Sequence, residues 1–173
     1  MPIVEDDRRR LDNLKHKLAR LDDLTLTIGV HSDVPPHQDD GMAIGMAELA
    51  AIHEFGTSKI PERSFLRAGI ALHEGDINER AAHAVGKLID GAYAPDEVLE
   101  YVGELGLGDI RDFLTSGQVK QGLSATTIAS REKKAGHGGG VAGLAGSHLA
   151  LIDTGQLMGS LAFKVSDTPA EDR

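Results

Sequence analysis

Two short strings in this chain contain residue types that hydrolases use. In the first, His53 and Glu54 are adjacent, as they are at the start of a metalloprotease motif. In that motif two histidines four residues apart on a helix bind zinc, and the glutamate acts as the general base. The second histidine is missing here, because position 57 is threonine. The eight histidines are scattered, and no pair with ligand spacing has a supporting acidic residue. We expect no zinc site.

The second string is Asp153-Thr154-Gly155, which resembles the active-site sequence of aspartic proteases. Those enzymes need two carboxylates that share a proton, so a chain with one string would have to dimerise. Only 20 residues follow Asp153 to build the remaining sheet. A structural role explains the same residues, with Asp153 as a helix N-cap and Gln156 completing a capping box. We favour the cap. A hydrolase using Asp153, or His53 with Glu54, is the alternative.

Three late glycines fit the spacing of a dinucleotide-binding loop. Gly138, Gly140 and Gly143 match G-x-G-x-x-G, but the residues before them are polar and basic and do not predict a strand. The motif binds a cofactor only where it joins a strand to a helix within a βαβ unit. We therefore expect no catalytic residues, no cofactor and no metal.

Composition limits the remaining function classes. The chain has 173 residues, which suits one domain with its own core. It has no cysteine, which fits a reducing compartment, and it has neither a long apolar run nor an apolar signal core at its start. Its net charge of -9 argues against tight DNA binding through phosphate neutralisation. An acidic protein can still surround DNA without adhering to it, because like charges repel.

Residues 1–23 are predicted to form a separate N-terminal amphipathic helix. Leu11, Leu14, Leu18 and Leu21 recur at spacings of three and four, which places them on one helical face. The run of arginines at 8–10 follows acidic residues and is interpreted as a solvated face. The leucine stripe has two interpretations that stay open. It packs on its own domain, or it packs on a neighbouring subunit.

A strand and a helix are predicted next. Residues 24–31 alternate between apolar and small polar side chains, which is typical of a half-buried strand. Prolines and aspartates then predict a loop. Residues 42–55 return to a helical pattern, and Gly56 is suited to a left-handed cap after it.

Two longer helices follow in the middle of the chain. Ser64 is a plausible N-cap for one helix to about Asp90, with Gly91 as its stop. Pro95 opens another helix that runs through Leu114. Glycine in a helix interior costs about 1 kcal/mol relative to alanine, so a bend or break is expected near Gly103, Gly106 and Gly108.

The last third of the chain is predicted to be mostly irregular. Residues 115–150 are rich in glycine and are interpreted as a long flexible loop, because ordering such a backbone is entropically costly. A short helix and a strand at 161–165 follow. Residues 167–173 form a polar tail.

The stretch from 50 to 67 combines a helix end, a glycine stop, a proline-stiffened link and a helix start. It resembles the signature of the tail-completion, or neck, proteins of long-tailed bacteriophages. In that family a helix ends in a His/Glu-Phe-Gly-Thr turn, followed by Ile-Pro-x-Arg-x-Phe entering a long helix. The matching residues here are His53, Glu54, Phe55, Gly56, Thr57, Ile60, Pro61, Arg63 and Phe65.

Two further segments match the same family in order and spacing. Residues 151–157, Leu-Ile-Asp-Thr-Gly-Gln-Leu, precede Ser160 and a closing strand, as in the family's Leu-Ile-Asp-Thr-Gly-x-Leu. Residues 123–128 resemble the Leu-Ser-x-x-Thr segment of the branch that includes Mu-like virion morphogenesis proteins. The resemblance covers residues 24–166, which would form the tail-completion domain.

The resemblance implies an α+β subunit in which a small antiparallel sheet packs against a long helix, with additional helices and a long glycine-rich loop. It implies a structural virion protein, not an enzyme, assembled in the host bacterial cytoplasm. The subunits would form a ring, expected to be hexameric, that joins the tail to the head connector. DNA would pass through its lumen without specific binding.

The expected contacts of this ring lie in the stretch just described. They are Glu54, Phe55, Gly56, Thr57, Ile60, Pro61, Arg63 and Phe65. Ring closure needs head-to-tail contacts, and Arg63 is a candidate for a charge-assisted pair across subunits. Two alternatives remain open. Arg63 pairs within its own chain, and Phe65 is an ordinary core residue.

Overall fold

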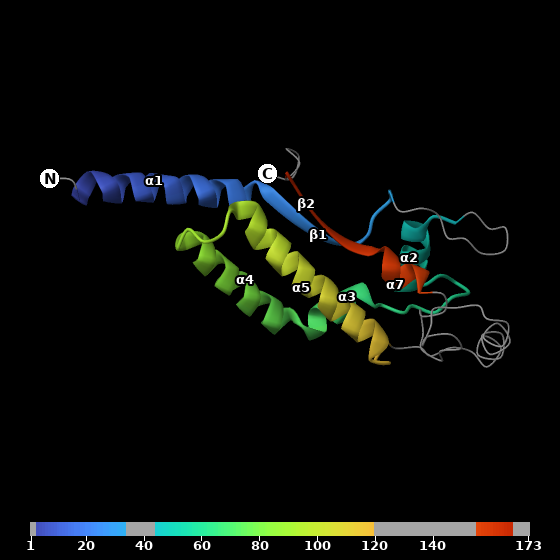
Figure 1. Cartoon of the computed structure of the whole chain (residues 1–173). Helices are drawn as coiled ribbons and strands as arrows, with labels where there is room; N and C mark the ends of the chain where they lie inside the picture. The colour runs from blue at the N-terminus through green and yellow to red at the C-terminus, as the bar shows by residue number, and fades with distance from the viewer. Residues whose placement is uncertain (1–2, 34–43, 120–154, 168–173) are drawn as a thin grey trace. The chain divides into compact units, whose positions relative to one another are not determined.

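The computed structural model describes residues 3–33, 44–119 and 155–167. The fold is α+β, as expected, with two antiparallel strands packed against the long helix α5 (Figure 1). The described elements are α1 (Ile3–Asp22), β1 (Leu24–Val30), α2 (Met46–Phe55), α3 (Leu66–Leu72), α4 (Glu74–Ile89), α5 (Pro95–Thr115), α7 (Gln156–Ser160) and β2 (Leu161–Asp167).

The chain divides into two compact units. Unit 1 contains Met1–Ile28, Glu74–Gly106 and Phe163–Arg173, and unit 2 contains Gly29–His73 and Leu107–Ala162. Both strands and α5 contribute residues to each unit. The division does not fall at the end of the N-terminal helix, since α1 groups with α4 and the first half of α5.

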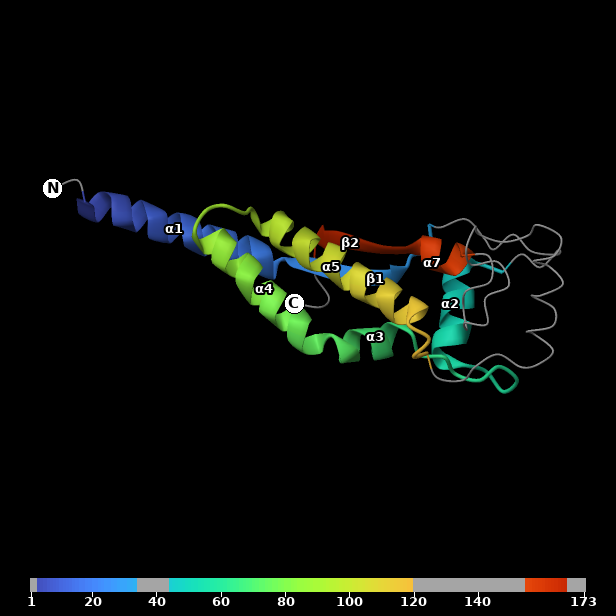
Figure 2. The ribbon, with the colours of Figure 1, turned by 60° about the horizontal axis from the view of Figure 1, so that its bottom comes forward.

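The core of unit 1 lies where α4 and the first half of α5 run side by side (Figure 2). Ala84 and Leu88 of α4 and Val98 and Val102 of α5 are buried together there. Leu21, near the end of α1, packs against this cluster and is only partly buried. The end of α1 is therefore joined to the core by an apolar contact.

The predicted break in the glycine-containing helix does not occur, because α5 is a single helix over 21 residues. A Cβ at Gly103 would lie 2.7 Å from the ring of Phe163 and 2.8 Å from the side chain of Leu26. A Cβ at Gly106 would lie 3.0 Å from Ile28. These two glycines let the helix approach the sheet closely. The sheet contact thereby offsets their low helix propensity.

The long helix predicted from residue 64 to 90 is two helices. α3 ends at Leu72, and His73 leaves the helical conformation, with φ -106° and ψ 12°. The Nδ1 atom of His73 lies 4.0 Å from a carboxylate oxygen of Asp109. No proline lies at this break, and the nearest glycine, Gly75, follows it within the first turn of α4. The predicted stop is confirmed, since Gly91 has a φ of 81° and its N–H donates to the carbonyl of Leu88.

Unit 2 is organised around the second half of α5. A Cβ at Gly69 of α3 would lie 3.5 Å from the side chain of Phe113, so α3 packs closely on α5. Helices α2 and α7 are in contact. The Arg111 side chain donates a hydrogen bond of 3.0 Å to the carbonyl of Leu161. Phe65, Leu114 and Leu161 are among the fully buried side chains.

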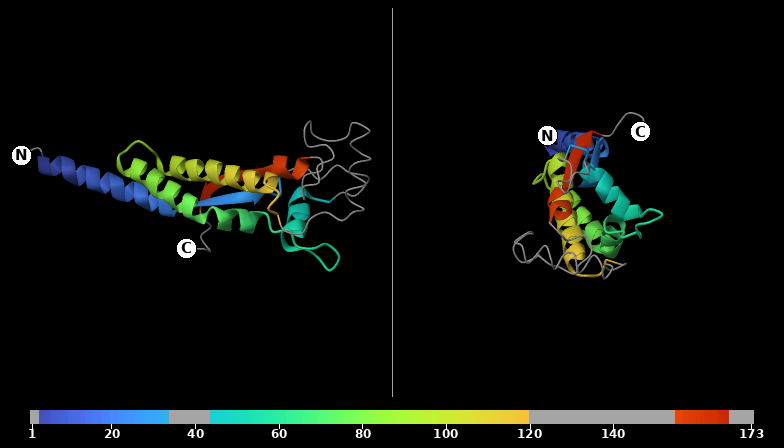
Figure 3. Two further views of the ribbon diagram at one scale, coloured as in Figure 1. Left: turned by 90° about the horizontal axis from the view of Figure 1, so that it is seen from below. Right: turned by 90° about the vertical axis from the view of Figure 1, so that its right-hand side faces the viewer.

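The remaining sequence predictions can be compared with the described residues. Strand β1 and strand β2 are confirmed, and the two strands lie next to each other (Figure 3). Helix α2 begins at Met46, four residues later than predicted, and residues 34–43 lie outside the described part. Most of the predicted glycine-rich loop, residues 120–154, also lies outside it. None of the described helices combines the length and apolar character that a membrane crossing requires.

Candidate functional site at the connector between helices α2 and α3

The chain reverses direction in a connector, residues 54–67, that begins in the last turn of α2. Gly56 closes α2 with its N–H donating to the carbonyl of Ile52 at 2.9 Å. Its φ is 72°, in the region that side-chain-bearing residues avoid. A Cβ at this position would lie 2.7 Å from the backbone nitrogen of Glu62 and 2.9 Å from the carbonyl oxygen of Ile60. Only glycine fits here without moving the backbone.

Residues 57–60 of the connector form a tight turn, which hydrogen bonds of Thr57 stabilise. The N–H of Thr57 donates to the carbonyl of Ile60 at 2.8 Å. The Thr57 hydroxyl accepts from the N–H groups of Lys59 and Ile60, at 3.2 and 3.0 Å. The chain that follows the turn is joined to α2 by a hydrogen bond, in which the N–H of Arg63 donates to the carbonyl of His53 at 2.8 Å.

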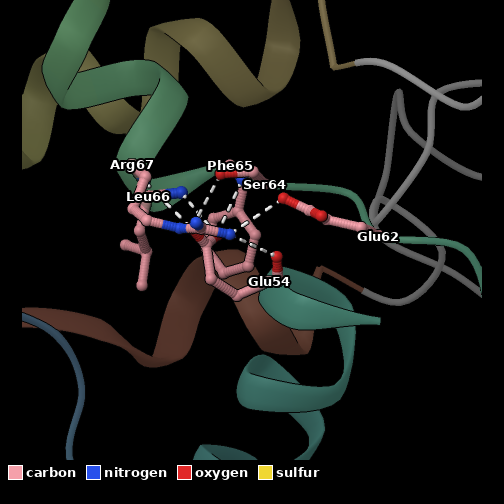
Figure 4. A network of polar contacts seen from close by, with 6 residues as sticks. All are labelled: Glu54, Glu62, Ser64, Phe65, Leu66 and Arg67. Atoms are coloured by element: carbon pink, nitrogen blue, oxygen red, sulfur yellow. Dashed lines mark hydrogen bonds and ion pairs between the residues drawn. The ribbon is translucent and has the colours of Figure 1, made fainter. Parts of the chain in front are cut away.

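Glu54 joins the two ends of the connector. Its carboxylate is 3% exposed and accepts five hydrogen bonds (Figure 4). Three come from the backbone N–H groups of Phe65, Leu66 and Arg67 at 2.8, 2.9 and 3.1 Å. The Ser64 hydroxyl donates at 2.8 Å and the Arg67 Nε at 2.9 Å. The first N–H groups of a helix have no partner inside the helix, so Glu54 acts as the cap of α3.

The predicted N-cap role of Ser64 is therefore wrong. The N-cap position belongs to Phe65, which has no side-chain capping bond of its own. The Glu54 carboxylate satisfies several donors at once and carries the negative charge that a helix N-terminus favours. Ser64 donates to that carboxylate and does not cap the helix directly.

The environment of Glu54 acts on its pKa in two opposing directions. Burial raises the pKa of the carboxyl, because the charged form loses its hydration. The hydrogen bonds from Leu66, Arg67 and Ser64 stabilise the charged form and outweigh that effect, so the pKa of Glu54 is lowered. Glu54 is therefore held as a carboxylate whose acceptor sites are occupied.

Arg67 extends the network to the exposed surface. Its guanidinium bridges Glu54 and Glu62, with a hydrogen bond of 2.9 Å to each. It also lies over the ring of Phe55, 4.9 Å from the ring centroid, in the arrangement of a cation–π contact. Phe55 is 64% exposed, so one aromatic side chain is held at the surface by a charged partner.

The structure divides the predicted contact residues into two groups. Phe55, Thr57 and Pro61 are exposed, and Gly56, Ile60 and Arg63 are partly exposed. All six remain available for a partner surface. Arg63 already interacts within the chain.

The other two predicted contact residues are corrected. Phe65 is 0% exposed and belongs to the core of unit 2. Glu54 is directed inward onto the start of α3. Neither side chain can reach a partner, so both support the connector from inside. The sequence analysis did not identify Arg67 and Glu62 as part of the site. The two acidic residues Glu54 and Glu62, which lie within thirteen positions before Arg67, are the sequence signal for this ion-pair network.

The predicted cap near the end of the chain is placed differently. The N-cap of α7 is Gly155, with a φ of 76° and no side-chain cap bond. Gln156 is the first residue of that helix. Asp153 lies outside the described residues, and it does not occupy the N-cap position of α7.

A groove of about 680 Å³ borders the connector within unit 2. Glu62 and Ser64 contribute one polar edge, and Gln118 also lines it. Its apolar lining residues are Ala68, Ala71, Leu72 and Phe113. Leu72 is an exposed large apolar side chain. The connector thus presents an aromatic residue and a partly apolar groove.

The arrangement offers little to catalysis. Within the described residues no three metal-ligating side chains come together. A general base needs a free lone pair within reach of the proton it abstracts, and the carboxylate of Glu54 is already surrounded by donors. The site is suited to holding a surface in a fixed shape. Comparison of the chain with family models, curated proteins and solved structures gives no match.

Proposed function

We propose that this protein is a structural subunit of a bacteriophage particle. In this proposal its copies form a ring at the head-proximal end of the tail, expected to be hexameric. The ring joins the tail to the head connector and to the tail terminator or tube. DNA passes through the lumen without specific binding. The support from sequence is the joint match of three segments, in the same order and spacing, to tail-completion proteins.

One structural observation carries the proposal furthest. The residues of the first segment hold one another in a fixed arrangement, and the Glu54 carboxylate among them is occupied by hydrogen-bond donors. Gly56 permits the reversal, Thr57 closes the turn and Glu54 locks the turn to α3. Phe55 and the residues of the turn stay exposed. Aromatic residues held rigidly at the surface are favoured anchors of protein interfaces.

The charge of the chain supports passage of DNA without adhesion. The net charge of -9 is spread over a chain with 27 acidic and 18 basic residues. A lumen lined by such a subunit repels the phosphate backbone. A lumen lined mainly by lysine and arginine would contradict this part of the proposal.

Deletion of the gene from the phage or prophage that encodes it tests the proposal. We expect electron microscopy to show complete heads and tails that are not joined, and infectivity to be lost. Restoring the gene with Phe55→Asp should not restore joining, because the substitution places a charge at the exposed aromatic anchor. Ser58→Asp, which places the same charge at an exposed position in the adjoining turn, is the matched control and should restore it. Normal infectious particles from the deletion would refute the proposal.

The alternative is a hydrolase that uses Asp153, or His53 with Glu54. The inward orientation of Glu54 argues against the second pair. For Asp153, the substitution Asp153→Asn separates the two functions. An asparagine keeps the size and hydrogen-bonding ability of the aspartate side chain but cannot act as a catalytic carboxylate. Hydrolytic turnover that the wild-type protein shows and this variant lacks would favour the hydrolase.

A further inference from the structure

Helix α1 carries an apolar stripe that the structure leaves uncovered. Leu11 is 52% exposed and Leu18 is 41% exposed, whereas Leu21 packs against the core of unit 1. The N-terminal half of α1 extends past the end of α4 (Figure 3, left). Leu11 and Leu18 are exposed and Leu14 is partly exposed, so these three positions of the stripe stay largely uncovered within the chain. A helix with an apolar stripe gains most of its stability from packing that stripe.

The stripe is flanked by positive charge on both sides. On a helix with 3.6 residues per turn, Arg8 and Lys15 lie along one edge of the leucines, and Arg10 and Lys17 lie along the other. Residues 8–20 hold six of the 18 lysines and arginines but only one of the 27 acidic residues. That acidic residue, Asp12, lies 3.7 Å from Lys15 in an exposed pair, which contributes little in solvent.

Unit 1 also contains a shallow groove between α4 and α5. Its volume is about 470 Å³, and it is lined by Asp76, Glu79, Arg80, His83 and Tyr101. Tyr101 is half-buried and contacts the ring of His83, with the ring centroids 6.4 Å apart. The rings of Tyr101 and His83 form its floor, and the other three lining residues, Asp76, Glu79 and Arg80, are charged. Arg80 already interacts within the chain.

The two helices that form the rims of this groove, α4 and α5, both carry exposed carboxylates. Glu79 lies on the α4 rim. On α5, Glu97 and Glu104 lie one turn on either side of Tyr101, and Glu100 lies between them, all three exposed. Glu97 also accepts a hydrogen bond from the N–H of Ala94 at 2.6 Å, whereas Glu79, Glu100 and Glu104 form no ion pair recorded among the described residues.

We infer that α1 of one copy of this protein docks into the α4–α5 groove of a second copy. Two rows of cations flank the leucine stripe, and two rows of carboxylates flank the groove. The leucines would cover the Tyr101 floor while each basic edge faces an acidic rim. This is the helix-in-groove mode of recognition, in which apolar anchors supply affinity and flanking charges supply register.

Charge also selects the groove over a second α1 as the occupant. In a parallel pair of α1 helices Arg10 would face Lys15 of the other helix, and in an antiparallel pair Arg10 would face Lys17. Like charges at close range disfavour both pairings. Because the donor helix and the acceptor groove are different surfaces, the contact is head-to-tail, which generates rings when the rotation closes. The inference deepens the self-association in the proposed function, but its test uses purified protein alone.

Disulfide trapping tests the contact directly, because the chain has no cysteine. Full-length Leu14→Cys and full-length His83→Cys proteins, one with a longer tag, are mixed and oxidised. We expect the mixed dimer to be the main product by mass. Dimers of Leu14→Cys with itself, or no dimer, would overturn the inference. So would a double variant that closes its disulfide within one chain at high dilution and yields monomers.

Charge exchange distinguishes the contact from a general loss of folding. Lys17→Glu should weaken self-association, measured by sedimentation, by about tenfold or more. Arg9→Glu changes the charge equally on the opposite face of α1 and should have little effect. Arg10→Glu with Lys17→Glu should abolish association, and adding Glu79→Lys with Glu104→Lys in the same chain should restore it. Failure of the restoration, with circular dichroism showing intact folds, would overturn the inference without bearing on the virion role.

Discussion

Charged side chains join segments that are distant in sequence at two places in this protein, and the two differ in their surroundings. In the connector, Glu54 is buried and accepts five hydrogen bonds from residues 64–67. Near the end of α1, Arg20 is exposed and pairs with Asp96 at 3.5 Å and with Asp167. The Asp167 pair spans 147 residues of sequence, but water competes for every charge in it.

The difference shows which charged contact determines conformation. An exposed ion pair forms in a high-dielectric solvent and contributes little. A buried carboxylate is costly unless every lone pair is used, and removing it leaves its donors without partners. We therefore expect a change of Glu54 to disrupt the conformation of the whole connector. The end of α1, in contrast, is held mainly by the apolar contact of Leu21.

Replacement of Glu54 should give the largest loss of stability. Glu54→Leu leaves three backbone N–H groups, the Ser64 hydroxyl and the Arg67 Nε–H without their acceptor, so the free energy of unfolding should fall by about 3–5 kcal/mol. Glu54→Gln keeps one acceptor oxygen and should cost less, about 1–3 kcal/mol. Urea unfolding measures both. Glu48→Gln, an exposed change in the same helix, is the control and should lie within about 0.5 kcal/mol of wild type.

Two glycines with positive φ values differ in the room that they leave for a side chain. Gly56 and Gly91 have φ values of 72° and 81°, and such conformations cost a residue with a Cβ about 1–3 kcal/mol. The ψ of 179° at Gly56 adds to its cost, because essentially only glycine adopts that combination of angles. At Gly91 nothing lies within 4 Å of the added Cβ, whereas at Gly56 the connector backbone lies at 2.7 Å. Gly56→Ala should therefore destabilise clearly more than Gly91→Ala in urea unfolding. Equal losses would show that the connector backbone yields easily.

Several elements were predictable because their signals are local. The alternation of β1 and the proline before α5 gave these two elements nearly correct bounds, and Gly91 correctly marked the end of α4, whereas the start of α4 was missed. The role of Gly103 was not predictable in the same way. From the sequence alone, a glycine inside a helix predicts lower helix stability. Only the positions of Leu26 and Phe163 in the structure show that Gly103 lies where the helix contacts the sheet.

The position of the connector could be read from the sequence, but the roles of residues within it could not. The segment from Glu54 to Arg67 contains the residues that form the connector, so its position was readable from the motif. Ser64 has the residue type of an N-cap, yet a carboxylate from ten positions upstream takes that role. This outcome depends on the reversal at Gly56, which brings the two helix ends together. Residue type and spacing alone carry no information about that approach.

The pH dependence of stability should follow Glu54. Its pKa is lowered in the folded protein from the ordinary value of 4.5, so the unfolded chain takes up the proton first as the pH falls. The contribution of Glu54 is complete above about pH 4.5 and is lost as the pH falls through the folded pKa. The difference in unfolding free energy between wild type and Glu54→Gln should therefore shrink between pH 6 and pH 3. A constant difference would contradict the assignment.

The smallest effect is expected at Arg20. Arg20→Met removes both exposed ion pairs but keeps an aliphatic side chain along the surface of α1. The loss in the urea midpoint should be smaller than that of Gly91→Ala, and 1 M NaCl should remove most of it, because salt screens exposed charges. Leu21→Ala, one residue later, removes an apolar contact with the unit 1 core and should be more destabilising and insensitive to salt. A larger loss of stability for Arg20→Met than for Leu21→Ala at 1 M NaCl would contradict this. The exposed ion pairs would then stabilise the fold strongly, and the contrast with Glu54 would not hold.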